Sequence, residues 1–344
     1  IYTGFYTMSQ SSSDCKSIAR GGDDVSEVIG CPNATIYKSQ TNENMTNAGY
    51  ITGATYQVGE NWDQKFGLDV AISSLHTSWG VNATTIAAGS NQRGEYSEMP
   101  YVLAVAKQHN SSNIYTSKIY PDDGTQSRLY NQYGVKVVVS GDGKTIAVGS
   151  SNQESTAYNN SGNVIGTWEY SGKIYIYRNE SSIDSEWTKV GQINGNGYQD
   201  WLGSLTSGVD LNYDGTRLIV DGRNNARAVT NNQMMPYQAI YEIGGSSNSW
   251  TRSATLNGFE ATDVAISADG LVVAAVGSDD GCVRTYAYSS GTWVTRGNFS
   301  TSVCPNSYHR VALSSDGNVL VVSYEDSGRG YLDLYTFADD NWHL

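Results

Sequence analysis

The sequence predicts an all-β protein, namely a single β-propeller made of four-stranded antiparallel blades. One unit reads strand, turn, strand, turn, strand, turn, strand, and it is most complete over residues 264–293. The unit recurs along the whole chain with a period of roughly 45 to 70 residues, a range typical of propellers and solenoids. Four strands in each unit favour the propeller, and no amphipathic helix pattern interrupts the strands.

The elements of the clearest unit follow from its residue types. Residues 264–267 and 271–276 are short apolar runs of the kind that form buried strands. Asp269-Gly270 lies between them and predicts a hairpin turn, because glycine takes the positive φ of a tight turn and aspartate tolerates it. Asp279-Asp280-Gly281 repeats this punctuation before a third run at 282–288. The unit is therefore a meander and its Asp-Gly pair is a turn.

The copies predict six blades. They begin near Ser17, Val70, Val137, Val209, Val264 and Val311, and the blades span approximately residues 16–62, 66–132, 133–197, 200–258, 261–302 and 308–344. A seventh blade is the alternative if residues 91–132 fold as one. The last blade ends just after Trp342, short of an outermost strand. Residues 1–10 have strand composition, so we expect them to complete that blade and close the ring.

The repeats resemble two related families. The run SADGLVVAAVGSDDGCVRTY, from Ser267, resembles a WD40-type blade, although it lacks the Trp-Asp ending and the Gly-His start. WTKVGQINGNGYQDWLGSLTSGVDLNYDGTRLIV from Trp187 and WDQKFGLDVAIS from Trp62 are similar to FG-GAP-like repeats of secreted proteins in diatoms and related algae. The resemblance covers nearly the whole chain and implies a propeller. The calcium loop of integrin-type FG-GAP repeats is mostly absent.

Charge narrows the class of partner. The chain has 21 Lys and Arg against 34 Asp and Glu, so its net charge is 21 − 34 = −13. Nucleic acids and anionic membranes require basic surfaces, and this balance argues against both. The longest apolar runs, such as residues 101–106, are too short to span a bilayer.

Cysteines and glycosylation motifs predict a secreted protein. Cys15 and Cys31 are close in sequence, as are Cys282 and Cys304, and we expect disulfides between these neighbours, although three connectivities and four free thiols remain alternatives. Asn-x-Ser/Thr motifs occur at Asn33, Asn44, Asn82, Asn110, Asn159, Asn179 and Asn298. Most fall in predicted turns or loops, where glycans are attached. A chain rich in Asn, Ser and Thr would also show several such motifs by chance.

One segment offers a candidate calcium loop. In DLNYDGTRLIVD, the residues Asp210, Asn212, Asp214 and Asp221 match the D-x-N-x-D-G-x5-acid pattern, with Asp in place of the usual Glu. Against this, Asp214-Gly215 aligns with the Asp-Gly turn of other blades. Asp210 favours calcium, because other blades carry Val138, Ala265 or Ala312 there and a buried carboxylate needs a partner. Both interpretations stay open, and Ca²⁺ is the one cofactor that the sequence suggests.

The sequence selects no catalytic residue. SGDGKT at Ser140 resembles the end of a phosphate loop, but the first glycine of that loop is missing and a strand follows. His76, His109, His309 and His343 are scattered, and nothing singles out two of the many acidic residues as a glycosidase pair. Trp62, Trp187, Trp250, Trp293 and Trp342 recur once in each blade and predict packing between blades.

Three functions remain as hypotheses. The first is a secreted, non-enzymatic propeller that serves in adhesion or as a structural subunit of an extracellular assembly, such as a surface filament, flagellar hair or wall layer. Its partners would be proteins or copies of itself, and the excess of 25 Tyr over 5 Phe suits such contact surfaces. The second is a propeller that binds glycans or another ligand with calcium support. The third is a glycoside hydrolase-like enzyme with its site in the channel.

Overall fold

The structure is a computed structural model. It describes residues 17–20, 26–31, 34–41, 44–52, 64–92, 100–109, 111, 113–121, 132–158, 164–195, 197, 199–204, 208–222, 237–244, 249–257, 261–277, 282–299, 310–326 and 329–344. The regular elements in these ranges are β-strands. The described part of the chain contains no helix with the length and apolarity that crossing a bilayer requires. The chain divides into two compact units.

The N-terminal unit contains Tyr2–Gln153 and Ile174–Gln192. Its first sheet orders β1 (Ser17–Arg20), β2 (Ser26–Cys31), β3 (Ala34–Thr41) and β4 (Asn44–Thr52) as a meander. Its second orders β5 (Gln64–Ile72), β6 (Ala83–Gln92), β7 (Val102–Gln108) and β8 (Ile114–Ile119) in the same way. The third has the order β14 (Thr188–Asn194), β13 (Lys173–Arg178), β10 (Thr145–Ser150), β9 (Tyr133–Val139).

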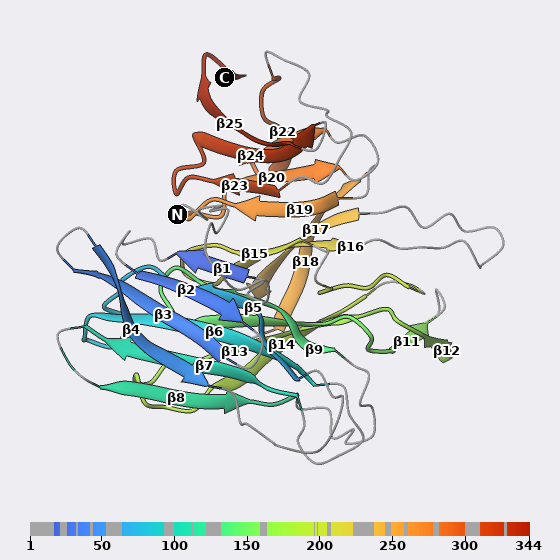
Figure 1. The fold of residues 1–344 in the computed structure, drawn as a ribbon. Coiled ribbons are helices and arrows are strands. Elements are labelled where there is room, and N and C mark those ends of the chain that lie inside the picture. Colours follow the sequence, from blue (N-terminus) through green and yellow to red (C-terminus); the bar gives the residue numbers. More distant parts are fainter. Residues whose placement is uncertain are drawn as a thin grey trace. The chain divides into compact units, whose positions relative to one another are not determined.

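The C-terminal unit contains Glu154–Lys173 and Ile193–Leu344, together with Ile1. A two-stranded ribbon, β11 (Ser155–Tyr158) and β12 (Val164–Trp168), precedes three meanders (Figure 1). These are β15 (Val209–Leu211), β16 (Arg217–Gly222), β17 (Tyr237–Gly244), β18 (Ser249–Asn257); β19 (Ala261–Ile266), β20 (Val272–Gly277), β21 (Val283–Ser289), β22 (Thr292–Thr295); and β23 (Arg310–Leu313), β24 (Val319–Asp326), β25 (Arg329–Ala338), β26 (Asn341–His343).

The predicted unit, a four-stranded antiparallel meander, is therefore confirmed. The second strand of the sheet is buried on both faces, since every residue of β10 and of β20 is buried. Burial on both faces explains why these strands are continuous apolar runs rather than alternating ones. The number of blades and the closure of a ring stay predictions, and the segments 1–10 and 93–99 lie outside the described residues.

The Asp-Gly turns between the first and second strands are confirmed where the structure describes them, with a difference in geometry, and the predicted turn at Asp279-Asp280-Gly281 lies outside the described residues. In each turn the glycine N–H donates to the carbonyl oxygen three residues earlier, as from Gly270 to Ser267 (2.9 Å) and from Gly317 to Ser314 (2.9 Å). Only the glycine is left-handed, at φ +73° for Gly270 and +67° for Gly317. The aspartate takes an ordinary backbone conformation, so its role lies in its side chain and not in tolerance of positive φ.

The last sheet corrects one expectation. The sequence predicts that this blade lacks its outermost strand, but β26 occupies that position and pairs with Thr336, Phe337 and Ala338. The chain reverses at Asp339 and Asp340, which both have positive φ (48° and 58°) as a tight hairpin turn requires. Because aspartate tolerates this conformation, the short strand after Asp340 folds back without a glycine.

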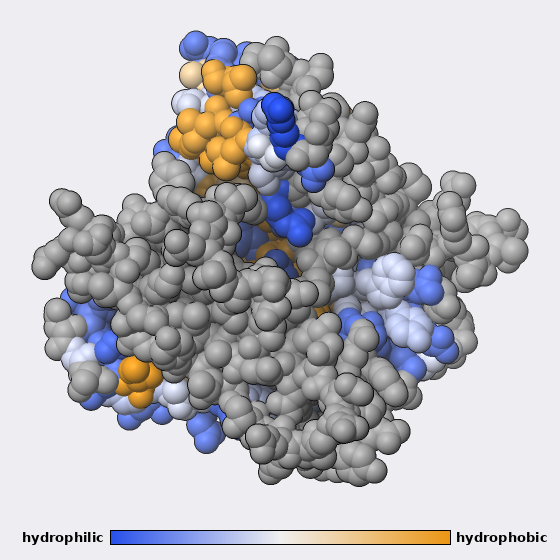
Figure 2. Space-filling model, viewed as in Figure 1, coloured by the Kyte–Doolittle hydropathy of each residue, from blue (hydrophilic) through white to orange (hydrophobic). Residues whose placement is uncertain are grey.

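Part of the last sheet is apolar and open to solvent. Tyr331, Leu332 and Leu334 on β25 are exposed, and Figure 2 shows apolar side chains, in orange, gathered on this C-terminal part of the molecule. The short strand β26 pairs only with residues 336–338 of β25, so the rest of that edge of β25 has no described strand beside it. Nothing among the described residues shows what covers the remaining face.

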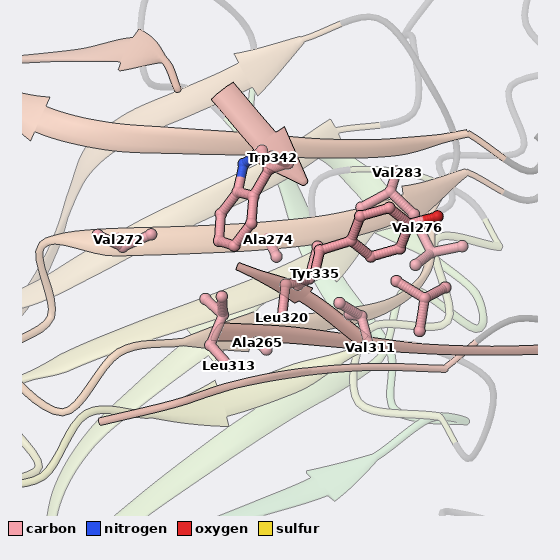
Figure 3. Close-up of a cluster of buried hydrophobic side chains, with 11 residues drawn as sticks. Ala265, Val272, Ala274, Val276, Val283, Val311, Leu313, Leu320, Tyr335 and Trp342 are labelled. Atoms are coloured by element: carbon pink, nitrogen blue, oxygen red, sulfur yellow. The ribbon is translucent and has the colours of Figure 1, made fainter. Parts of the chain in front are cut away.

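One core cluster of the C-terminal unit joins two neighbouring sheets. Ala274 and Val276 from β20 meet Val311, Leu320 and other residues of the last sheet. In Figure 3 the rings of Tyr335 and Trp342 point into this group. The Trp342 ring also makes polar contacts with the preceding sheet, because its Nε1 donates to Thr285 Oγ1 (2.9 Å) and to the Arg296 carbonyl oxygen (3.2 Å).

Removing the Thr285 hydroxyl should weaken this interface. In Thr285→Val the side-chain shape is kept, but Trp342 Nε1 and the Arg296 carbonyl oxygen, which accepts from Thr285 Oγ1 (2.6 Å), each lose a partner. We expect the free energy of unfolding to fall by about 1–3 kcal/mol, measured by urea denaturation. Thr295→Val, at an exposed position on β22, is the matched control and should change it by less than about 0.5 kcal/mol. Equal effects of the two changes would contradict the assigned role of Thr285.

Candidate functional site

Three of the described turns between the first and second strands share one set of side-chain hydrogen bonds. The serine that begins the turn donates from Oγ to Oδ1 of the aspartate two residues later, at 2.6 Å for Ser140–Asp142, Ser267–Asp269 and Ser314–Asp316. The serine oxygen also accepts from the first residue of the next strand, as from Val272 N (2.9 Å). The hydrogen bond from Ser314 lowers the pKa of Asp316, so this carboxylate is charged at neutral pH.

The candidate calcium loop has the same construction. Asn212 replaces the serine, and its Oδ1 accepts from Thr216 N (3.0 Å) and Arg217 N (2.8 Å). Asp214 Oδ1 accepts from Thr216 N (3.1 Å) and Thr216 Oγ1 (2.6 Å). These oxygens hold the turn, as the serine and aspartate oxygens do in the other sheets.

The other two predicted calcium ligands lie elsewhere. Asp210 Oδ1 accepts from Leu211 N (2.9 Å), and its Oδ2 accepts from Ile266 N (3.0 Å) on the next sheet. Asp221 lies beyond the far end of the β15–β16 pairing and accepts from Gln238 Nε2 (3.0 Å) and Ala261 N (3.2 Å). The described residues contain no group of three or more His, Cys, Asp or Glu placed to hold a metal. The geometry therefore favours the turn interpretation.

Neighbouring turns of the C-terminal unit are tied to each other through the backbone. Tyr213 N donates to the Ala268 carbonyl oxygen (2.9 Å), and Ala268 N donates to the Ser315 carbonyl oxygen (2.9 Å). These three residues hold the same position, the second, in three successive turns. The turns thus form one connected edge.

Two arginines reinforce this edge. Arg217 Nη1 donates to the Gly270 carbonyl oxygen (2.6 Å), and its guanidinium lies 5.2 Å from the centroid of the Tyr288 ring and 5.8 Å from that of Trp293. The Nη2 of Arg217 pairs with Glu242 Oε1 at 2.7 Å. The arrangement satisfies a turn carbonyl and places the cation over an aromatic pair, a favourable contact.

The second arginine repeats the arrangement one sheet further on. Arg296 Nη1 donates to the Gly317 carbonyl oxygen, and the guanidinium lies 4.0 Å from the Phe337 centroid and 5.5 Å from the Trp342 centroid. Phe337 pairs across the strands with Trp342, as Tyr288 pairs with Trp293. The Trp residues of these blades therefore pack between sheets, as their spacing predicts.

Exposed apolar side chains gather beside the first of these arginines. Tyr213 is 41% exposed, Leu271 39% and Tyr288 37%. They are linked through the backbone, because Tyr213 N bonds to Ala268 and Tyr288 N donates to the Leu271 carbonyl oxygen (2.8 Å). Tyr213, Leu271 and Tyr288, with the exposed carboxylates of Asp214 and Asp269, are called the turn-edge patch below.

An insert replaces the tight turn in the second sheet of the N-terminal unit. Residues 74–82 run against the next turn, where Ser78 Oγ donates to the Asp142 carbonyl oxygen (2.7 Å) and Trp79 Nε1 to the Asn179 carbonyl oxygen (3.2 Å). Thr85 Oγ1 donates to the Gly143 carbonyl oxygen (2.9 Å), which is the place that arginine takes in the other unit. The insert is thus a structural clamp on the neighbouring turn.

The fold brings two histidines to this clamp. His76 is 2% exposed, and its Nε2 is 3.3 Å from Thr85 Oγ1, while His109 Nε2 is 2.8 Å from Thr84 Oγ1. Burial, together with the charges of His109 and Lys144, lowers the pKa of His76 to about 4. His309 lies outside the described residues, and His343 is exposed.

A second buried polar group lies in the C-terminal unit. Asp200 and Asp221 are fully buried, and Tyr237 Oη donates to Asp200 Oδ2 (2.8 Å). Burial and the Asp200 charge raise the pKa of Tyr237 well above its ordinary value. In the described part of the chain these carboxylates accept hydrogen bonds that join neighbouring strands, from Tyr237 Oη to Asp200 and from Gln238 Nε2 and Ala261 N to Asp221.

The secretion markers are only partly visible. Cys282 is disulfide-bonded, but Cys15 and Cys304 lie outside the described residues and the pairing stays a prediction. Asn82 and Asn298 are exposed, as glycan carriers must be. Asn179 is 2% exposed and its Nδ2, the atom that would carry the sugar, donates to the Ser185 carbonyl oxygen (3.0 Å), so this position is unsuited to a glycan. Asn33, Asn110 and Asn159 lie outside the described residues, and the side chain of Asn44 is not described.

Sequence reasoning missed the residues that join the sheets. Asp69 Oδ2 accepts from Val137 N (2.8 Å) and Asp263 Oδ2 from Val311 N (3.0 Å), each reaching the first strand of the next sheet. Asp69 and Asp263 both stand four residues before the serine of their turn, and this spacing would have revealed them. Asp210 makes the same contact two residues later in its strand, which gives it the partner that its position demanded.

Solved propellers have similar folds. The sequence matches no family model and none of the curated proteins. The β-propeller domain of Cps50 (Swd1) from Myceliophteria thermophila aligns with TM-score 0.53 at 9% identity, covering 96% of this chain and 85% of that chain. KlAtg21, in its complex with the coiled coil of AgAtg16, aligns with TM-score 0.56 at 11% identity, covering 96% and 83%. A functionally unknown protein from Desulfotomaculum acetoxidans DSM 771 gives 0.54 at 12%, covering 95% and 83%.

These similarities define the class of the protein by fold alone. The described sheets are four-stranded antiparallel meanders, and two of the similar structures are WD40-type β-propellers. The FG-GAP-like assignment stays a prediction. A fold of this class is compatible with many functions.

The clamp on the Asp142 turn should tolerate no side chain at Gly143. Gly143 has φ +70°, and an added Cβ would overlap His76 Nε2 and lie 2.6 Å from Thr85 Oγ1. Gly80, in the same unit, has φ +74° with open space around it. We expect Gly80→Ala to lower the free energy of unfolding by about 1–2 kcal/mol through backbone strain, and Gly143→Ala by about 1–3 kcal/mol more through overpacking. Urea denaturation of both variants tests this, and equal losses would show that the clamp does not constrain Gly143.

The neutral state of His76 should make stability depend on pH. Its pKa is about 4 in the folded protein against 6.5 in the unfolded chain, so the unfolded chain takes up the proton first as pH falls. Stability is complete above pH 6.5 and is lost as pH falls toward 4, by up to about 3 kcal/mol. Unfolding free energies measured across this range in wild type and His76→Gln should differ in slope, with the shallower slope in the variant. Parallel curves would assign the pH dependence to other groups.

Proposed function

We propose that the protein is a secreted, non-enzymatic interaction propeller that serves in adhesion or as a structural subunit of an extracellular assembly. The fold supports the general part of this proposal, because propellers of the WD40 type are commonly scaffolds for protein interaction. One of the similar structures is itself a complex with a coiled coil, which is a protein partner. The extracellular setting rests on the cysteines and glycosylation motifs of the sequence.

The observation that carries the proposal is how the repeated polar residues are used. In the described turns the serine Oγ, asparagine Oδ1 and aspartate Oδ1 atoms make the hydrogen bonds that close the turn. The aspartates on the first strands accept hydrogen bonds from the next sheet. These groups serve the scaffold. The residues left for function are those that differ between blades, and in the C-terminal unit they include exposed aromatic and apolar side chains.

Glycan binding is the second candidate. Tyr288 is exposed beside the Arg217–Glu242 ion pair, and an aromatic face next to polar groups is a common way to bind a sugar. Protein contact is preferred because Tyr213 and Leu271 extend the same surface with further apolar area.

The mass of the native particle, isolated from its natural source, tests this function. We expect a particle much larger than 37.2 kDa, and we expect its mass to be unchanged by a calcium chelator because the turn oxygens already have protein donors. Dispersal by the chelator would restore the calcium interpretation and make Asp210 and Asp214 the first residues to change. A calcium-indifferent monomer would contradict the assembly and direct attention to glycan screens.

A further inference from the structure

The turn-edge patch is a rigid surface. Tyr213 and Leu271 belong to turns that are tied to each other by the Tyr213 N to Ala268 bond and by Arg217 at Gly270. The Tyr288 ring is held against Trp293, with 5.5 Å between centroids, and lies under the Arg217 guanidinium. A partner that binds here meets a turn backbone and a Tyr288 ring that are already held in place, which reduces the conformational freedom lost on binding.

The patch also carries two carboxylates, Asp214 and Asp269, and the charge of Asp269 also acts on Arg296, whose pKa it raises against the effect of burial. Asp214 and Asp269 use Oδ1 within their turns, while their Oδ2 atoms have no hydrogen-bond partner among the described residues. The adjacent cation, Arg217, is already engaged by Gly270, by Glu242 and by the aromatic pair. The surface therefore combines exposed tyrosine side chains with two exposed carboxylates.

We propose that the turn-edge patch binds a segment of a protein partner in which Lys or Arg alternates with apolar residues. A cation placed at the patch would gain a carboxylate oxygen and the face of the Tyr213 ring, since Arg217 already lies over Tyr288, and the apolar residues would cover Leu271. A second copy of this chain is a poor occupant, because two chains of net charge −13 repel each other. This inference rests on the proposed interaction function and names the chemistry of the partner.

A peptide array tests the proposal with the full chain. The array holds 12-residue peptides in which Lys or Arg alternates with Leu or Tyr, and matched peptides in which Ser or Glu replaces the cation. We expect the protein to bind the basic peptides and not the Ser or Glu series, with affinity that falls as salt rises. Fluorescence anisotropy with the best labelled peptide then gives the dissociation constant.

Two pairs of variants locate the binding. Tyr213→Ser and Leu271→Ser should each weaken binding by about tenfold, whereas Tyr331→Ser, at another exposed position in the same unit, should leave it unchanged. Asp214→Asn and Asp269→Asn keep the Oδ1 acceptor of the turn and remove the charge, so they should weaken binding about three- to tenfold and reduce its salt dependence. Asp184→Asn, an exposed carboxylate bonded to Ser182 in the other unit, is the charge control.

Three results would overturn the inference. These are the absence of preference for basic peptides, equal losses in the control and patch variants, and binding of glycans at the patch in place of peptides. A monomeric native particle that still binds basic peptides through the patch would refute the assembly and leave the patch standing. An assembly that survives all patch variants, without peptide binding, would refute the patch and leave the assembly standing.

Discussion

The carbonyl oxygen of the turn glycine is the group on which the packing of successive sheets depends. The serine and aspartate side chains close each turn from within, and the glycine takes the left-handed conformation that turns its carbonyl outward. A donor from the preceding sheet then bonds to that oxygen: Arg217 at Gly270, Arg296 at Gly317 and Thr85 at Gly143. Because the bond crosses from one sheet to the next, the turn sets the distance between sheets as well as the hairpin itself.

The aspartates on the first strands also join successive sheets, by accepting hydrogen bonds from backbone N–H groups. Asp69, Asp210 and Asp263 each accept an N–H of the next sheet's first strand. That strand has no further strand beyond it, so its outward N–H groups would otherwise lack a partner. A carboxylate meets this need more strongly than a neutral acceptor does. Some of the acidic residues of the chain therefore have a structural role, because their carboxylates join neighbouring sheets.

The meanders and turns could be predicted from the sequence because they depend on local patterns. Apolar runs around Asp269-Gly270 and Asp316-Gly317 are enough to specify strand, turn and strand. The contacts between sheets could not be predicted in the same way. Arg217 reaches Gly270 across 53 positions and Ser78 reaches Asp142 across 64, and nothing in the local sequence of either donor indicates its partner.

In the candidate site, too, the local pattern could be predicted from the sequence and the contacts of its side chains could not. Asn212 and Asp214 match a calcium loop in sequence, but this pattern does not distinguish oxygens that point at a cation from oxygens that point at backbone N–H groups. The turn-edge patch could not be predicted from the sequence, because Tyr213 and Tyr288 are 75 residues apart (288 − 213). The two residues are brought together by the backbone hydrogen bonds from Tyr213 N to Ala268 and from Tyr288 N to Leu271.

A comparison of the two tryptophans beside the arginines shows which contact the repeat preserves. Trp342 Nε1 bonds to Thr285, which pairs with Ala274 across the strands. In the preceding sheet the corresponding residue is Ile240, which pairs with Ile219, and the buried Trp293 Nε1 has no acceptor among the described residues. The tryptophan hydrogen bond is thus lost from one interface, while the arginine still bonds to the turn carbonyl and still lies over the aromatic pair in both. A buried N–H without a hydrogen bond lowers the stability of the folded protein by about 1–3 kcal/mol, and the fold forms without that bond at this interface. The arginine contact, with its aromatic pair, is therefore the constraint that recurs, and residues beside it such as Tyr213 and Leu271 are the ones free to differ between blades.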